Sequence, residues 1–101
     1  MTDIKTLTDA MHQFVASKGW YDENSLRPQS LRNLAISLNL EAGEVLEHFQ
    51  WSDELKDREA LAGELADVML YLLQLASLAE IDISQAVLDK LKVNQSRTWD
   101  E

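Results

Sequence analysis

The sequence predicts an all-α fold, a four-helix bundle formed by one chain of 101 residues. Apolar residues recur with the 3.6-residue period of a helix along most of the chain. Three glycines and one proline supply too few turns for a sheet. Four periodic segments follow one another with short links, which is typical of a helical bundle. No repeat or boundary signal divides the chain, so residues 1–101 are expected to form a single domain.

The first helix is predicted over Asp3–Lys18, with Asp3 as its N-cap. One apolar stripe runs along it, formed by Ile4, Leu7, Met11 and Phe14. Gly19 follows at the position where a glycine commonly ends a helix. The polar stretch Trp20–Pro28 is then expected to be a loop, with Trp20 conspicuous at its start.

The second helix is expected over Gln29–Gln50, and the third from Asp53 or Asp57 to Glu80. Both are apolar over more than one stripe, through Leu34, Ile36, Leu38, Leu40, Val45, Leu46 and Phe49 on the second and Leu61, Leu65, Val68, Met69, Leu70, Leu72, Leu73 and Leu75 on the third. A helix that is apolar nearly all round is buried on several sides. A monomer this small offers nothing to cover the outer sides, so a homo-oligomer with these helices at its centre is predicted.

The fourth helix is expected to follow the short link Ile81–Ile83 and to end near Arg97. Asp82 and Gln85 have the spacing of a capping box. Lys90, Asn94 and Arg97 share one face of this helix. Such a face suits phosphate oxygens, but it is equally compatible with a solvated last turn whose cations favour the helix C-terminus.

The net charge of −9 argues against duplex DNA or RNA as a ligand, because phosphate backbones would be repelled. The chain has no cysteine, which excludes disulfides, thiolate metal sites and a cysteine nucleophile and fits a reducing compartment. Its start lacks the features of a signal peptide. The longest apolar run, Val68–Leu73, is far shorter than the roughly 20 residues that span a bilayer. A soluble, cytoplasmic protein without membrane contact is expected.

Four carboxylates carry the chemistry that the sequence predicts. Glu41 and Glu44 lie three residues apart on the second helix, and Glu64 and Asp67 lie three apart on the third, all within strongly apolar stretches. Residues at i and i+3 project from the same helix face, so antiparallel packing would bring the four acids together. Their mutual repulsion would be relieved by a hard divalent cation such as Mg²⁺, which prefers oxygen ligands and sites shared with substrate phosphates.

The same faces continue as polar and aromatic stripes, which are Ser37, Glu41, Glu44, His48 and Trp51 on the second helix and Glu64, Asp67, Tyr71 and Gln74 on the third. Two such stripes would suit the walls of a cleft. Trp20 or Trp51 could stack on a base, although a tryptophan more often belongs to a core or an interface. Two histidines and no cysteine make a zinc site poor, and the paired ExxH pattern of di-iron bundles is missing.

The stretches LAISLNLEAGEVLEHFQW (34–51) and ELADVMLY (64–71) resemble the MazG-type all-α nucleoside triphosphate pyrophosphohydrolases, closest to their small, dCTP-pyrophosphatase-like branch. The resemblance extends from Phe14 to Arg97. It implies a homo-oligomer, commonly a tetramer built as a pair of dimers. It also implies Mg²⁺-dependent hydrolysis of a (deoxy)nucleoside triphosphate to the monophosphate and pyrophosphate, with Mn²⁺ as a possible substitute and house-cleaning of the nucleotide pool as the role.

Carried onto this chain, the resemblance assigns each residue of the motif a role. The metal ligands would be Glu41, Glu44, Glu64 and Asp67. The substrate would be bound by Trp20, Trp51, Tyr71, Lys90, Asn94 and Arg97, with the two tryptophans bracketing the base and the last three handling the triphosphate. Glu44 is our choice for the carboxylate that takes the proton of the attacking water, although nothing in the sequence singles it out.

The chain departs from this family at three places. Leu40 replaces an additional glutamate of larger MazG proteins, which favours the small branch. Gln29-Ser30-Leu31 stands where many relatives have His-x-Pro, and Met11 stands where some dCTP-preferring relatives have a base-contacting histidine, with His12 one place off. These departures leave the base preference open. Two rival hypotheses remain, a non-catalytic adaptor that self-associates and binds partners through an acidic face, and a protein that holds a nucleotide without cleaving it.

Overall fold

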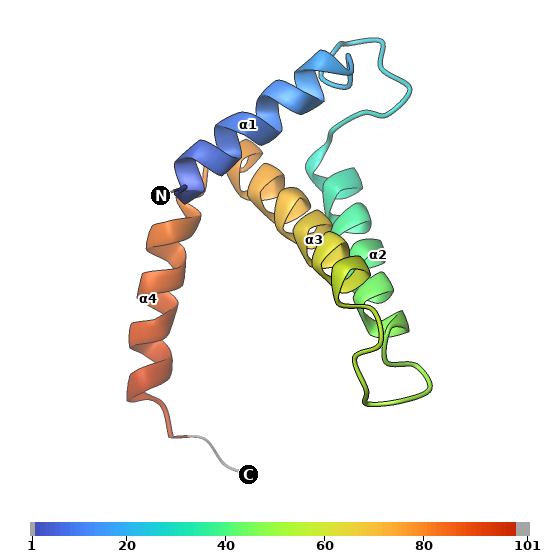
Figure 1. Cartoon of the computed structure of the whole chain (residues 1–101). Coiled ribbons are helices and arrows are strands. Elements are labelled where there is room, and N and C mark those ends of the chain that lie inside the picture. The colour runs from blue at the N-terminus through green and yellow to red at the C-terminus, as the bar shows by residue number, and fades with distance from the viewer. Residues whose placement is uncertain (1, 99–101) are drawn as a thin grey trace.

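The computed structural model describes residues 2–98 and confirms the all-α fold (Figure 1). Four helices follow in order: α1 (Ile4–Ser17), α2 (Leu31–Glu47), α3 (Arg58–Leu78) and α4 (Ile83–Ser96). Within residues 2–98 no strand is present. Each observed helix end lies within three residues of the predicted one. The start of the third helix is left out of this comparison because two positions were predicted for it. The predicted domain limits, residues 1 and 101, lie outside the described range.

Every helix begins at a side chain that caps its first turn, because the first backbone N–H groups of a helix have no partner within it. The N-caps are Asp3, Ser30, Asp57 and Asp82. Asp57 accepts from the backbone N–H of Ala60, so α3 starts after Asp57 and not after Asp53. The predicted capping box of α4 is only half formed. The backbone N–H of Gln85 donates to the Asp82 side chain, but the Gln85 side chain donates to Asp89 at 2.8 Å and does not reach back to Asp82.

Two helices end in a left-handed residue. Gly19 has φ 73° directly after α1, as its position predicted. Glu80 has φ 59° after α3, where the N–H of Ile81 donates to the carbonyl of Ala76 at 2.8 Å. This C-terminal motif favours glycine, and a residue with a Cβ is strained there.

Replacing Glu80 by Gly is therefore expected to raise the free energy of unfolding by about 0.5–1 kcal/mol, the strain relieved less the added flexibility of the unfolded chain. Ala79→Gly is the matched control, because Ala79 has φ −84° and gains nothing from glycine. Urea denaturation at one protein concentration measures both. Equal destabilisation by the two substitutions would show that Glu80 is not strained.

Helices α2 and α3 run antiparallel side by side, and α1 crosses the C-terminal half of α3 (Figure 1). Helix α4 contacts the end of α3 and then diverges from the other helices. The core is accordingly small. Its buried apolar residues are Met11, Val15, Leu34, Leu73 and Ala76.

The protomer is open for its size. Its radius of gyration is 16.2 Å, whereas a compact domain of this length has about 13 Å. Its accessible surface is 8190 Å², against about 5800 Å² for a folded monomer of its mass. Large apolar side chains remain exposed on α2, α3 and α4, among them Ile36, Leu40, Leu46, Leu65, Leu70, Val87, Leu88 and Leu91. A single copy thus leaves uncovered much of the surface that the apolar pattern marks for burial.

Candidate functional site

An acidic cluster lies between α2 and α3, formed by Glu41 and Glu44 of α2 and Glu64 and Asp67 of α3. Burial raises the pKa of Glu41, and a hydrogen bond with Glu44 and the negative charges of the other two acids raise it further. The Oε2 atom of Glu41 is buried and has no hydrogen-bond partner. The antiparallel pair of helices therefore brings the four acids within electrostatic reach of one another, as their spacing predicts.

Glu64 is held by a histidine that directly follows the facing helix, α2. His48 Nε2 lies 2.7 Å from Glu64 Oε2, and these side chains are only 16% and 28% exposed. Among residues 2–98, no three acidic or histidine side chains converge closely enough to hold one cation as they stand. The acids are neighbours, and Glu64 is already paired with His48 at 2.7 Å.

The raised pKa of Glu41 has a consequence for stability. The folded protein holds the carboxyl proton of Glu41 more tightly than the unfolded chain does. Protonated Glu41 therefore contributes to stability below its ordinary pKa of 4.5, and this contribution is lost as the pH rises through the raised pKa. In EDTA, Glu41→Gln is therefore expected to be more stable than the unsubstituted protein at neutral pH, with the difference vanishing below pH 4.5. Urea denaturation of both proteins between pH 4 and pH 8 measures that difference. A difference independent of pH would contradict the prediction.

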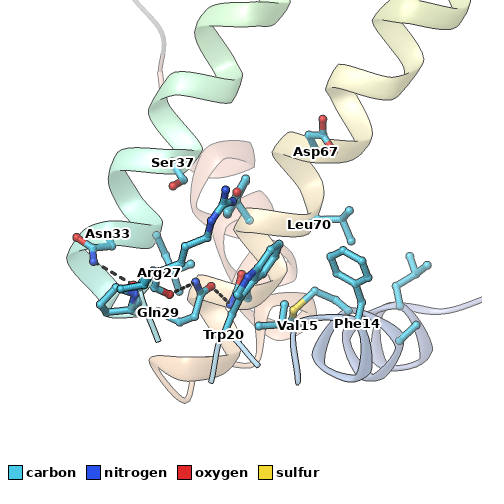
Figure 2. A pocket seen from close by; sticks show the side chains of 17 residues that line it. Phe14, Val15, Trp20, Arg27, Gln29, Asn33, Ser37, Asp67 and Leu70 are labelled. Carbon is cyan, nitrogen blue, oxygen red and sulfur yellow. Dashed lines mark hydrogen bonds between the residues drawn. The ribbon is translucent and has the colours of Figure 1, made fainter. Parts of the chain in front are cut away.

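A cavity of about 640 Å³ opens beside this cluster, between α1, the segment after it, α2 and α3 (Figure 2). Aromatic rings of Phe14, Trp20 and Tyr71 line it. Trp20 meets Phe14 edge to face at 5.7 Å between ring centroids, and the guanidinium of Arg27 lies 5.2 Å from the Trp20 ring. Asp67 of the acidic cluster also lines the cavity. An aromatic chamber that reaches a group of carboxylates fits a flat heterocycle that carries a phosphate chain.

A network of polar side chains lies at the cavity wall and behind it. Gln74 is 2% exposed, and its Nε2 donates to Gln29 Oε1 at 2.7 Å and to the hydroxyl of Tyr21 at 3.2 Å. The same hydroxyl lies 2.7 Å from His12 Nδ1, and His12 Nε2 lies 2.7 Å from Ser77 Oγ. Burial raises the pKa of Tyr21, so its hydroxyl keeps its proton at neutral pH.

The structure does not bring all the predicted substrate residues to one place. Trp20 and Tyr71 line the cavity, whereas Trp51 is 88% exposed in the segment between α2 and α3 and is not among the lining residues. The stripe residues Lys90, Asn94 and Arg97 belong to the diverging end of the chain and do not line the cavity either (Figure 1). Their roles stay predictions.

Other lining residues carry only weak signals in the local sequence. Gln74 is a polar residue inside the apolar stretch of α3 and belongs to its polar stripe, and Gln29 is distinctive only as a departure from a motif. Phe14 belongs to the apolar stripe of α1, and no sequence pattern assigns Arg27 or Asn33 to a site, yet all three line the cavity. Nothing in the local sequence distinguishes an apolar residue facing a cavity from one facing a core.

Known proteins resemble this chain in sequence and in fold. A sequence profile of the MazG-like family matches residues 36–100. The chain belongs to the MazG-like family. This MazG-like chain also resembles the crystal structure of a pyrophosphatase from Archaeoglobus fulgidus, with a TM-score of 0.79 and 34% identity, over 94% of this chain and 91% of the other.

Two curated relatives match over shorter parts of their length. The dCTP pyrophosphatase 1 of Mus musculus is 37% identical over 94 residues, which cover 84% of this MazG-like chain and 52% of the mouse protein. A dATP/dGTP diphosphohydrolase of Salmonella phage PMBT28 is 53% identical over 38 residues, which are 38% of this chain and 13% of the phage protein. The chain thus spans about half the length of the mouse relative, and much less of the phage one.

Proposed function

We propose that the protein is an enzyme that hydrolyses (deoxy)nucleoside triphosphates to the monophosphate and pyrophosphate in a Mg²⁺-dependent reaction. The observation that carries this proposal is the aromatic cavity with Asp67 in its lining, since one side chain thereby belongs both to the chamber for a base and to the acidic cluster. The printed activities of the mouse and phage relatives support the same reaction class. House-cleaning of the nucleotide pool is the proposed role, with dCTP-like or non-canonical deoxynucleotides as substrates.

The residues present fit a divalent cation. Four carboxylates supply oxygen ligands of the kind that Mg²⁺ or Mn²⁺ prefers, and the buried, unpartnered Oε2 of Glu41 is costly without a positive partner. Glu41, Glu44, Glu64 and Asp67 would therefore hold the metal. When bound, such an ion neutralises phosphate charge and lowers the pKa of a bound water.

The side chains of this chain would then orient the reactants. Trp20 and Tyr71 place the nucleoside in the cavity by stacking and edge contacts, so that its phosphates extend toward Asp67. Glu44, on the same helix face as Glu41, would accept the proton of the attacking water. Lys90, Asn94 and Arg97 would bind triphosphate oxygens, and Trp51 would cover the second face of the base. These four residues do not line the cavity of their own chain. Their contacts with the substrate therefore require another copy of the chain, or a movement of α4 and of the segment between α2 and α3.

A homo-oligomer, with a tetramer favoured over a dimer, is part of this proposal and is supported by the exposed apolar faces of α2, α3 and α4. The net charge of −9 supports the absence of a nucleic-acid partner.

Helix α3 is long and apolar enough, by length and composition, to cross a membrane. It carries Glu64, Asp67 and the buried Gln74 and packs on α1 and α2, so we assign its apolar surface to packing within and between protomers in a cytoplasmic protein.

The test is release of pyrophosphate from a panel of canonical and modified ribo- and deoxyribonucleoside triphosphates, with Mg²⁺ or with EDTA. Release of pyrophosphate together with the monophosphate, in Mg²⁺ only, is the expected result. Absence of product from folded, assembled protein would refute the enzymatic proposal. Retained nucleotide binding would then favour the binding-protein hypothesis, and loss of both would favour the adaptor.

A further inference from the structure

The polar network at the cavity wall has a direction that one backbone carbonyl fixes. Gln29 Nε2 donates to the carbonyl oxygen of Arg27 at 2.6 Å (Figure 2). A carbonyl can only accept, so the amide nitrogen of Gln29 must face Arg27 and its Oε1 must face Gln74. That oxygen in turn can only accept, which requires that Gln74 presents its Nε2 to Gln29 at 2.7 Å.

Both N–H groups of Gln74 are thereby used, one by Gln29 and the other by the hydroxyl of Tyr21. The Tyr21 hydroxyl accepts from Gln74 and also lies 2.7 Å from His12 Nδ1, and His12 Nε2 lies 2.7 Å from Ser77 Oγ. These contacts link five side chains from Gln29 to Ser77. What Gln74 has left is an acceptor, its Oε1, on a buried amide that lines the cavity.

We propose that Gln74 determines base specificity by accepting a hydrogen bond from the exocyclic amino group of a 4-aminopyrimidine or a 6-aminopurine. The matching oxo bases would place a carbonyl oxygen against Gln74 Oε1, where two acceptors face each other without a proton. This inference rests on the proposed function and names the substrate class of the same site. Gln74 lies two helical turns beyond Asp67 on α3, roughly 10 Å along the axis, which leaves the length of a nucleoside between the base end and the acidic end.

The experiment uses pairs of nucleotides that differ only at this position, dCTP against dUTP and dATP against dITP. The unsubstituted protein is expected to prefer the amino member of the pair that it hydrolyses by about tenfold or more in kcat/KM. Gln74→Met keeps the side-chain volume and removes the acceptor, so the preference is expected to fall to about threefold or less. Calorimetry measures the affinities for dCMP and dUMP without any turnover. The preference for dCMP over dUMP should likewise fall in Gln74→Met.

A second variant tests the direction of the network itself. Gln29→Met removes the acceptor that fixes Gln74, so the Gln74 amide can rotate and offer either an N–H or its oxygen. Turnover of dUTP is then expected to rise relative to dCTP, whereas a purely structural role would lower both together. Because Gln29→Met leaves Gln74 in place, it also decides the question if Gln74→Met does not fold.

The outcomes separate this inference from the proposed function. Hydrolysis with no amino preference, or with a preference that both variants retain, would overturn the role of Gln74 and leave the enzyme intact. Absence of hydrolysis with selective binding of dCMP over dUMP would support Gln74 and refute the enzyme. Absence of both hydrolysis and selective binding would overturn the inference and the proposed function together.

Discussion

Replacing Glu41 by Gln or Asp67 by Asn is expected to lower kcat at saturating Mg²⁺ by about 100-fold or more. Loss of a group that merely supports a metal ligand costs about 10–100-fold, and these carboxylates are the proposed ligands themselves. Each substitution removes one negative charge while keeping nearly the same shape. The loss therefore reports the charge and not the packing between α2 and α3.

Pyrophosphate release under single-turnover conditions is the measurement, and Glu59→Gln on the exposed start of α3 is the matched control. A thermal melt gives a second readout without substrate. Binding of Mg²⁺ to the folded state raises its stability by mass action, about 2.7 kcal/mol at 100 times Kd, and either variant should lose most of this gain. If both variants turned over normally and responded to Mg²⁺ as the control does, the acidic cluster would not be the metal site.

The local sequence predicted those features of the fold that depend on local chemistry. Asp3 and Asp82 start their helices as caps, and Gly19 ends one in the left-handed region. Glu80 takes the same conformation after α3, although no glycine stands there to signal it. The course of α4 was also outside local prediction, since its contacts with the rest of the protomer are few.

The candidate site divides in the same way. The four acids could be found from spacing, because an i, i+3 pair on each of two adjacent helices fixes a common face. The network around Gln74 could not, since its members are 45 and 53 residues apart in sequence from their partners Gln29 and Tyr21. Each of these residues is ordinary in its own segment. They are neighbours because the segment between α1 and α2 packs against α3.

The largest effect on stability is expected from the exposed apolar stripe of α4, which consists of Val87, Leu88 and Leu91. The protomer exposes roughly 2400 Å² more than a compact monomer of its mass would. That excess exceeds the area of about 800 Å² that each partner buries in a standard interface, and it is in the range of obligate assemblies. With a core of five buried apolar side chains among residues 2–98, an isolated protomer has little to offset its conformational entropy.

Leu88→Glu is therefore expected to reduce the assembled mass measured by light scattering and to lower Tm by about 10 °C or more. The loss of one buried leucine alone is worth about 2 kcal/mol, and each kcal/mol shifts Tm by about 4–8 °C in a domain of this size. Lys92→Gln makes the same change in charge on α4 outside the apolar stripe and should leave mass and Tm nearly unchanged. Tm of the unsubstituted protein should rise with protein concentration, because folding and assembly are then one equilibrium. A monomer whose Tm is independent of concentration, with Leu88→Glu as stable as Lys92→Gln, would show that the open protomer stands alone and that no second copy covers α4.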